Sequence, residues 1–334
     1  MLDADRLLAG PRGRRLCFEL IAQAADGLTG WVWELMTPEP GSAPYLAAGR
    51  SWGRALHAFR SAMPSAKEPT RVRDDADLDG FTAHLATIDV VLDADRLMRA
   101  FSASADRAMY WQSPDQEDVL CAHPAVIQAL RPIAEQVVAH PDACWWSTPA
   151  AAEQWWLADS DLTDGEPLAD DPWELAGWWS TPMPAAYTTR AVGDLGPVGL
   201  WLEEDAFDHT RYEARLVDVP GAVLEIDASD AWIELCRRHP REVPRDMADT
   251  WHQVTGRRGR WVLPDWRVVA CEWAGVHVQP SAYLAGATRA LPVDDTAATM
   301  IAGWHPDATY WFTRPAVIRT EQWHRQGDAP WRRA

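Results

Sequence analysis

The side chains best suited to chemistry lie in two short runs of the C-terminal half. In YTTRAV, the alternation of a strand puts Arg190 on one face with Thr188, and in GVHVQ it puts His277 on one face with Gln279. An arginine on a sheet can clamp a phosphate or a ribose, and a histidine nearby can act as an acid, a base or a hydrogen-bond donor. We therefore take Arg190 and His277 as candidate catalytic residues. The competing interpretation is that local partners within the fold satisfy both side chains.

Tryptophan is unusually frequent, with 21 residues in a chain of 334. An indole combines a large apolar body with a single donor, so most of these rings are expected in the core. Some could instead line a cleft and stack on a nucleobase, a nicotinamide or a sugar ring. The pentapeptide WWSTP occurs twice, at 145–149 and 178–182. We take Trp178 and Trp179, together with Arg190, as candidate residues for binding such a ligand or cofactor.

Lys67 is the only lysine in the chain. It lies in PSAKEPT, a run whose prolines are typical of a loop. This position argues against the protein classes that need a lysine in a defined element. They are P-loop proteins with a lysine under the phosphates, enzymes with a pyridoxal Schiff base, and kinases with a strand lysine.

Three other motif matches lack the context that their chemistry needs. Residues 49–53 match the G-x-S-x-G motif of hydrolases, but only about fifty residues precede them, too few for the upstream strands of that fold. Residues 75–80 match the first half of a calcium loop, but Ala86 stands where a glutamate is needed, and the acidic run 159–165 is out of register. No histidine pairs with another histidine or a cysteine at the spacing of zinc ligands. We therefore expect no required metal.

The composition favours an acidic protein of the cytoplasm. The formal net charge of −18 means that the average surface repels phosphate backbones and anionic lipid, which leaves room only for a local basic patch. The first residues lack the features of a secretory signal, and no apolar run is long enough to span a membrane. The five cysteines form no C-x-x-C pair, which suits free thiols in a reducing compartment. We expect no membrane association and no general nucleic-acid binding.

The spacing of apolar residues predicts mainly helices over residues 1 to about 140. One helix is expected to begin after Asp93 as its N-cap, and another near Pro124, whose missing donor suits a first helical turn. Pro132 is expected to kink or split this second helix. Residues 141–185, rich in tryptophan and proline, predict a connecting segment.

Beyond residue 186 the pattern changes to short runs of period two, at YTTRAV, VGLWLEED, AVLEID and GVHVQ. Helices are expected between them, around residues 230–239 and 264–273. This alternation predicts a mixed sheet with helices packed on it. The predicted fold class is α+β, in which a mainly helical domain at 1–140 packs against a mixed α/β domain at 186–334.

Three phrases of the chain resemble an uncharacterised actinobacterial family of Trp-rich proteins. They are LLAGPRGRRLC at 7–17, YWQSPDQEDVL at 110–120 and AGWHPDATYWF at 302–312. The likeness spans most of the chain. It implies a real fold and carries no activity with it.

A strand arginine followed by several short strands is also similar to the layout of ADP-ribosyltransferases, in which an arginine positions NAD. This resemblance implies that Arg190 holds NAD as a substrate, with His277 or Tyr283 as polar partners, so Tyr283 joins the candidate catalytic residues. The chain departs from the family at the catalytic glutamate. WAGVHVQPSAYL carries no glutamate on its strand, and Glu225 in AVLEID comes too early.

Two hypotheses about function follow from these observations. The first is an intracellular enzyme that acts on a nucleotide-like or other planar ligand in a tryptophan-lined cleft, with an NAD-dependent ADP-ribosyltransferase-like transferase as its most specific form. The second is a non-enzymatic interaction or scaffold protein, whose acidic surface binds a basic protein partner. The first rests on the aromatic density with Arg190 and His277, and the second on the charge of −18.

Overall fold

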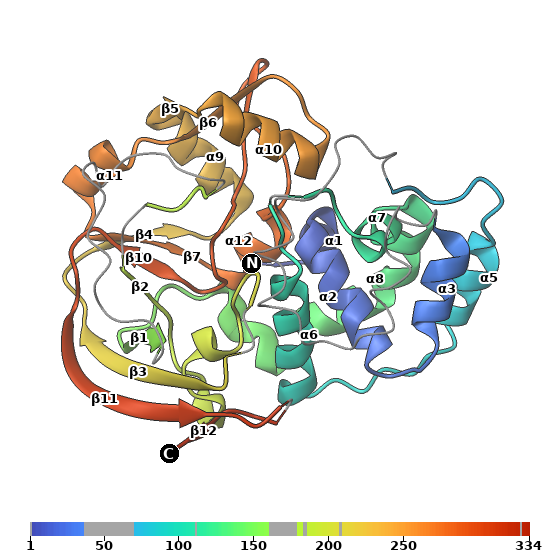
Figure 1. The fold of residues 1–334 in the computed structure, drawn as a ribbon, viewed down its shortest axis with the longest axis horizontal. Coiled ribbons are helices and arrows are strands. Elements are labelled where there is room, and N and C mark those ends of the chain that lie inside the picture. The colour runs from blue at the N-terminus through green and yellow to red at the C-terminus, as the bar shows by residue number, and fades with distance from the viewer. Residues whose placement is uncertain are drawn as a thin grey trace, which may run out of the picture.

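The computed structural model describes residues 2–36, 70–110, 112–159, 179–182, 186–206, 209–327 and 329–334. It has the α+β fold that the sequence predicts. A mainly helical N-terminal part packs against a C-terminal part built from mixed and antiparallel sheets with helices on them (Figure 1). Within the described residues, no helix is long and apolar enough to cross a membrane.

The N-terminal part is a group of helices around α2, which contacts α1, α6, α7 and α8 and also reaches α12 of the C-terminal part. As predicted, Asp93 is the N-cap of α6, and its side chain accepts a hydrogen bond from the backbone N–H of Arg96 at 2.8 Å. The bounds of these helices are α1 Ala4–Ala9, α2 Pro11–Ala22, α3 Leu28–Leu35, α5 Leu78–Leu85, α6 Ala94–Asp106, α7 Gln116–Cys121 and α8 Pro124–Ala139.

Helix α8 begins at Pro124, as predicted, but Pro132 does not split it. The helix runs without interruption to Ala139. A proline inside a helix removes one donor and leaves the carbonyl four residues earlier, that of Gln128, without its usual partner. Both Pro132 and Gln128 are exposed, so water can bind that carbonyl. The buried stripe on the opposite side of α8 then holds the helix together.

The C-terminal part contains three four-stranded sheets. The first is antiparallel, in the order β1 (Gln154–Asp159), β3 (Arg211–Asp218), β11 (Ala316–His324) and β12 (Arg332–Arg333). The second is mixed, in the order β2 (Ala186–Thr188), β10 (Thr309–Trp311), β7 (Gly275–Val278) and β4 (Val223–Ile226), with β4 parallel to β7. The third has the order β5 (Pro240–Glu242), β6 (Arg260–Pro264), β9 (Ala297–Thr299) and β8 (Leu291–Pro292).

Helices cover these sheets, and the two predicted ones are confirmed as α9 (Ser229–Arg238) and α11 (Trp266–Glu272). The others are α10 (Arg245–Thr255) and α12 (Pro280–Gly286), with 3-10 turns η1 (Pro141–Ser147), η2 (Gly193–Leu195) and η3 (Val198–Leu200). Several of the tryptophans fill the core between sheets and helices, as the composition predicts. Trp232, Trp266 and Trp304 pack against one another with ring centroids 5.8–6.2 Å apart.

Of the four runs predicted as strands, three contain strands, β2, β4 and β7. The prediction for VGLWLEED is wrong, because this run begins with the 3-10 turn η3. Gly196 before it has a φ of 71°, which turns the chain, and Pro197 follows. Consecutive apolar side chains of the run, from Leu200 to Leu202, are all buried, whereas a strand would send them to opposite faces.

Candidate functional site

The mixed sheet lines up four polar side chains in one row. Glu225 of β4 pairs with His277 of β7, His277 pairs with Thr309 of β10, and Thr309 pairs with Thr188 of β2. Residues directly opposite each other on paired strands point to the same face of a sheet. Because the four strands come from distant parts of the chain, this row joins residues that the sequence keeps far apart.

A chain of alternating charges crosses this face. The Arg190 Nε–H donates to Asp307 Oδ1 at 2.6 Å, and His277 Nε2 lies 3.2 Å from the same oxygen. On its other side, His277 Nδ1 lies 2.7 Å from Glu225 Oε2. Arg190, Asp307 and His277 are buried, whereas the Glu225 side chain is 28% exposed. Glu225 is therefore the member of the chain that solvent or a ligand can reach.

Asp307 is the centre of this chain, and it was not among the residues predicted from the sequence. It has a φ of 65°, a left-handed conformation that aspartate tolerates better than most residues. Its second oxygen, Oδ2, accepts the backbone N–H of Arg190 at 2.9 Å, so one carboxylate fixes both the backbone and the side chain of Arg190. The only hint in the sequence was the turn-forming run HPDAT just before β10.

The neighbours of His277 decide its charge. Burial disfavours the charged imidazolium, but hydrogen bonds and attraction from Asp307 and Glu225 outweigh it and raise the pKa of His277. Burial acts in the opposite direction on Glu225, yet the hydrogen bond and charge of His277 and the Ala150 N–H together lower the pKa of this carboxyl. Glu225 is therefore a carboxylate at neutral pH, and His277 holds a proton more readily than a free imidazole does.

All three guanidinium nitrogens of Arg190 donate hydrogen bonds to protein atoms. Its Nη1 donates to Thr148 Oγ1 at 2.5 Å, and its Nη2 donates to the carbonyls of Thr148 and Pro149 at 3.2 and 2.8 Å. Its guanidinium carbon lies 5.5 Å from the ring centre of Trp145. Residues of the first WWSTP copy thus hold the Arg190 side chain in place. These contacts agree with the interpretation that local partners satisfy this arginine, and they suit it to positioning Asp307 and His277.

Glu225 is fixed at the open end of the chain. Besides His277, its Oε1 accepts the Ala150 N–H at 2.8 Å, and its Oε2 is 3.4 Å from Gln279 Nε2. A cavity of about 180 Å³ borders this part of β4, between α9 and α11. Its lining is apolar at Leu224 and Leu235, with Trp273 and polar residues around it. Glu225 belongs both to the charge chain and to the wall of this cavity.

Thr309 adds an unsatisfied group beside His277. Its side chain is fully buried, and its Oγ1 has no hydrogen-bond partner among the described residues. Thr309 carried no signal in the sequence, whereas Thr148 lies in the repeated WWSTP pentapeptide.

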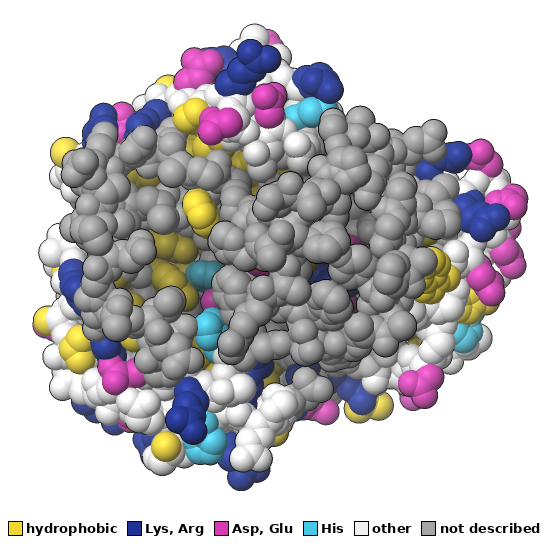
Figure 2. All heavy atoms as spheres, in the orientation of Figure 1, with side chains coloured by type: hydrophobic (Ala, Val, Ile, Leu, Met, Phe, Trp, Pro, Cys, Tyr) yellow, Lys and Arg dark blue, Asp and Glu magenta, His cyan; other side chains and the backbone are white. Residues whose placement is uncertain are grey.

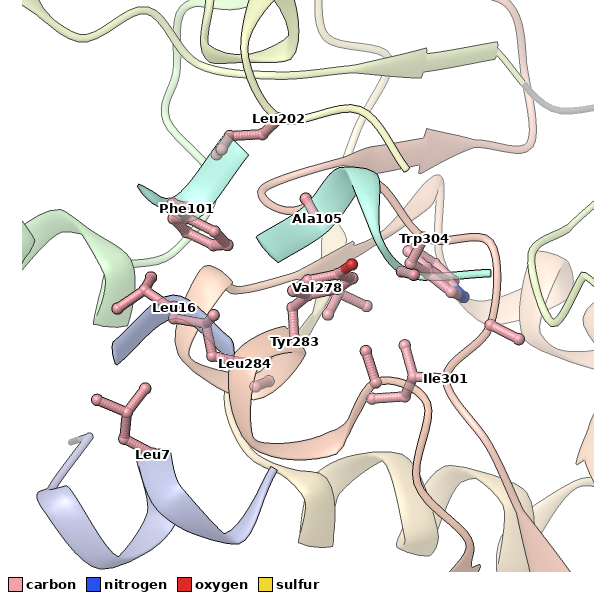
Figure 3. Packing of buried hydrophobic residues seen from close by; sticks show 14 of the residues in the cluster. Leu7, Leu16, Phe101, Ala105, Leu202, Val278, Tyr283, Leu284, Ile301 and Trp304 are labelled. Atoms are coloured by element: carbon pink, nitrogen blue, oxygen red, sulfur yellow. The ribbon is translucent and has the colours of Figure 1, made fainter. Parts of the chain in front are cut away.

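The structure places Tyr283 in a different cluster from Arg190 and His277. Pro280 begins α12 directly after β7 and carries Tyr283 towards the helical part, where it lies among Phe101, Val278 and Trp304 (Figure 3). It is fully buried. The only described member of the predicted tryptophan pair, Trp179, is half-buried against Gly303, and Trp178 lies outside the described residues.

The second WWSTP copy has a structural role in its described residues. Ser180 Oγ accepts the Ala302 N–H at 2.8 Å and the Trp304 Nε1–H at 3.1 Å, and it is fully buried. The two copies are therefore used differently. The first copy holds Arg190, and Ser180 of the second copy binds the segment 302–304, which belongs to the tryptophan core.

Among the described residues, no group of three or more histidine, cysteine, aspartate and glutamate side chains could hold a metal ion. The G-x-S-x-G match at 49–53 and most of the acidic run at 159–165 lie outside the described residues. In the run 75–80, Asp77 instead serves as the N-cap of α5. Comparison of the chain with protein-family models, curated proteins and solved structures gave no match.

Proposed function

We propose that this protein is an enzyme acting on a nucleotide-like, planar ligand, and that the Glu225 carboxylate is its catalytic residue. The proposal depends on one observation. Glu225 is the solvent-reaching end of an otherwise buried chain of four ionisable side chains, where an imidazole and a backbone N–H fix both of its oxygens. Perturbed ionisable groups arranged in this way are concentrated at functional sites.

The energetics of the chain support a functional role. Taking charges out of water costs more than their mutual attraction returns unless the geometry is very good, and apolar residues of similar volume are often equally stable. Arg190, Asp307 and His277 are each less than a tenth exposed, so all three bear this cost. If these buried side chains served stability alone, apolar residues would serve as well. They are needed if their role is to fix the position and the charge of the Glu225 carboxylate.

The low pKa of Glu225 selects the chemistry. A carboxylate that is already ionised and hydrogen-bonded is a weak proton acceptor at neutral pH. It is well suited to accept hydrogen bonds from ligand hydroxyls and to stabilise positive charge that develops in a transition state. A ribose offers such hydroxyls, and its anomeric carbon becomes positive when a glycosidic bond breaks.

The most specific form of the proposal is an NAD-dependent transferase similar to ADP-ribosyltransferases. Nicotinamide would leave with the electron pair of its glycosidic bond, while an oxygen of water or of an acceptor would bond to the ribose carbon and lose its proton. Glu225 would supply the carboxylate for which the sequence pattern offered no counterpart. Arg190 would then act as a positioning residue, because protein atoms already occupy its donors.

Tryptophan fluorescence during titration with NAD, other nucleotides and sugars tests the proposal. We expect a saturable change with a nucleotide-like ligand that Glu225→Gln weakens at least tenfold. Glu234→Gln is the matched control, since Glu234 lines the same cavity outside the charge chain, and it should change the affinity less than twofold. If no ligand changes the fluorescence, the enzyme proposal fails. The acidic interaction protein would then be the better hypothesis, with salt-sensitive capture of a basic partner as its own test.

A further inference from the structure

The antiparallel sheet has one buried face and one face rich in arginine. Trp155, Ala214 and Trp323 lie on the first face and are buried. On the other face, the register puts Trp156, Arg215 and Thr320 in one row. Arg211, His324 and Arg332 form a second row. We call the set Trp156, Arg211, Arg215, Arg314 and Arg332 the arginine face.

Trp156 organises the centre of the arginine face. The guanidinium carbons of Arg314 and Arg215 lie 4.5 and 4.9 Å from its ring centre. Stacking of this kind uses the flat faces of a guanidinium and leaves its N–H edges available for hydrogen bonds. Glu213 binds the Arg215 edge at 2.6 Å, while Arg314 is exposed. Trp156 therefore holds at least one guanidinium in a defined position at the surface.

The charge of this face is opposite to that of the chain. The chain carries −18, yet the arginine face has four arginines and, on the same face of β3, one glutamate. Figure 2 shows dark-blue basic side chains along the lower edge of the molecule, where Figure 1 places β11 and β12. Because the Debye length is about 8 Å at physiological ionic strength, distant acidic groups are largely screened from this face.

We propose that the arginine face binds single-stranded nucleic acid through its phosphate backbone. The partner must be anionic, because arginine predominates here. Arg211, Arg314 and Arg332 are exposed, and they can each contact a phosphate. A sheet surface on which Trp156 holds guanidinium planes suits unpaired bases, which can stack on such planes, whereas a duplex is read by an element that enters a groove. This binding is independent of the reaction proposed at Glu225.

Fluorescence anisotropy of a labelled twelve-nucleotide oligo-dT tests this inference with the full-length protein. Three phosphate contacts would give a salt slope of about −2 in a plot of log affinity against log salt. The triple variant Arg211→Gln, Arg314→Gln, Arg332→Gln should bind at least tenfold more weakly at 50 mM NaCl. All three side chains are exposed, so the variant should keep the melting temperature of the parent.

The control is the triple variant Arg6→Gln, Arg71→Gln, Arg245→Gln. It changes the net charge by the same amount at arginines on α1, before α5 and on α10, and it should bind within twofold of the parent. Equal weakening in both triple variants would show that only net charge matters and would overturn the inference. No binding of oligo-dT by the parent protein at 50 mM NaCl would overturn it too. Binding of polyglutamate in its place would point to an acidic protein partner.

Discussion

Replacing Glu204 with glutamine should remove a large part of the pH dependence of stability. Glu204 is 7% exposed, and its Oε1 accepts the Tyr110 hydroxyl at 2.6 Å. Burial raises the pKa of Glu204 from 4.5 to about 8, even though the Tyr110 hydrogen bond acts against the shift. The folded protein therefore holds this carboxyl as a neutral acid at pH 7, whereas the unfolded chain has it ionised.

The sign and size of this pH dependence of stability follow from proton linkage. Between pH 4.5 and 8 the folded state binds one proton more than the unfolded state at this position, so stability falls as the pH rises. One pH unit corresponds to about 1.4 kcal/mol, so the loss due to Glu204 between pH 5.5 and 7.5 is about 2–3 kcal/mol. Glutamine has the same shape and does not titrate.

Urea unfolding at pH 5.5, 6.5 and 7.5 measures this effect as a difference between the two proteins. Other titrating groups, including His277, contribute equally to both and cancel. The free energy of unfolding of Glu204→Gln should rise relative to the parent by about 2–3 kcal/mol across this range. Parallel pH profiles would refute the reasoning, because they would mean that Glu204 is ionised in the folded protein.

Three further substitutions test the packing of the site and the fold by urea unfolding at pH 7. Asp307→Asn should destabilise the protein by about 3–5 kcal/mol, because it leaves Arg190 and His277 buried without their shared anion; a loss below 1 kcal/mol would contradict the charge chain. Ser180→Ala should cost about 2–3 kcal/mol, since two buried N–H donors lose their acceptor; an unchanged unfolding midpoint would be the opposing result. Pro132→Ala should stabilise the protein by about 1–3 kcal/mol, because it restores a helical donor in α8. Destabilisation would mean that the helix depends on the proline.

Local patterns in the sequence were enough for several elements of the fold. The N-cap at Asp93, the helix start at Pro124 and the strand in AVLEID were all predicted correctly. Each of these features depends only on residues close by in the sequence. The strand predicted for VGLWLEED was wrong, because alternation of apolar and polar residues was not the feature that decided its conformation. The turn at Gly196 and the burial of successive side chains together favour a 3-10 turn.

The candidate site was only partly predictable, because its contacts are long-range. Arg190 and Asp307 are 117 residues apart in the chain, and Glu225 and His277 are 52 apart. Nothing local announces that β4 runs parallel to β7, so Glu225 could not be placed beside His277 from the sequence. Tyr283 is close to His277 along the chain, but the turn into α12 at Pro280 carries it elsewhere.

The proposed role of Glu225 requires that the buried chain hold it as a carboxylate that faces the ligand. Carbon-13 NMR of glutamate-labelled protein measures it directly, with Glu225→Gln identifying the resonance. The Glu225 carboxyl should titrate below 4.5, its ordinary value, and its signal should shift when the nucleotide found by fluorescence is added. A midpoint at or above that value, or a signal that the bound nucleotide leaves unmoved, would contradict the account.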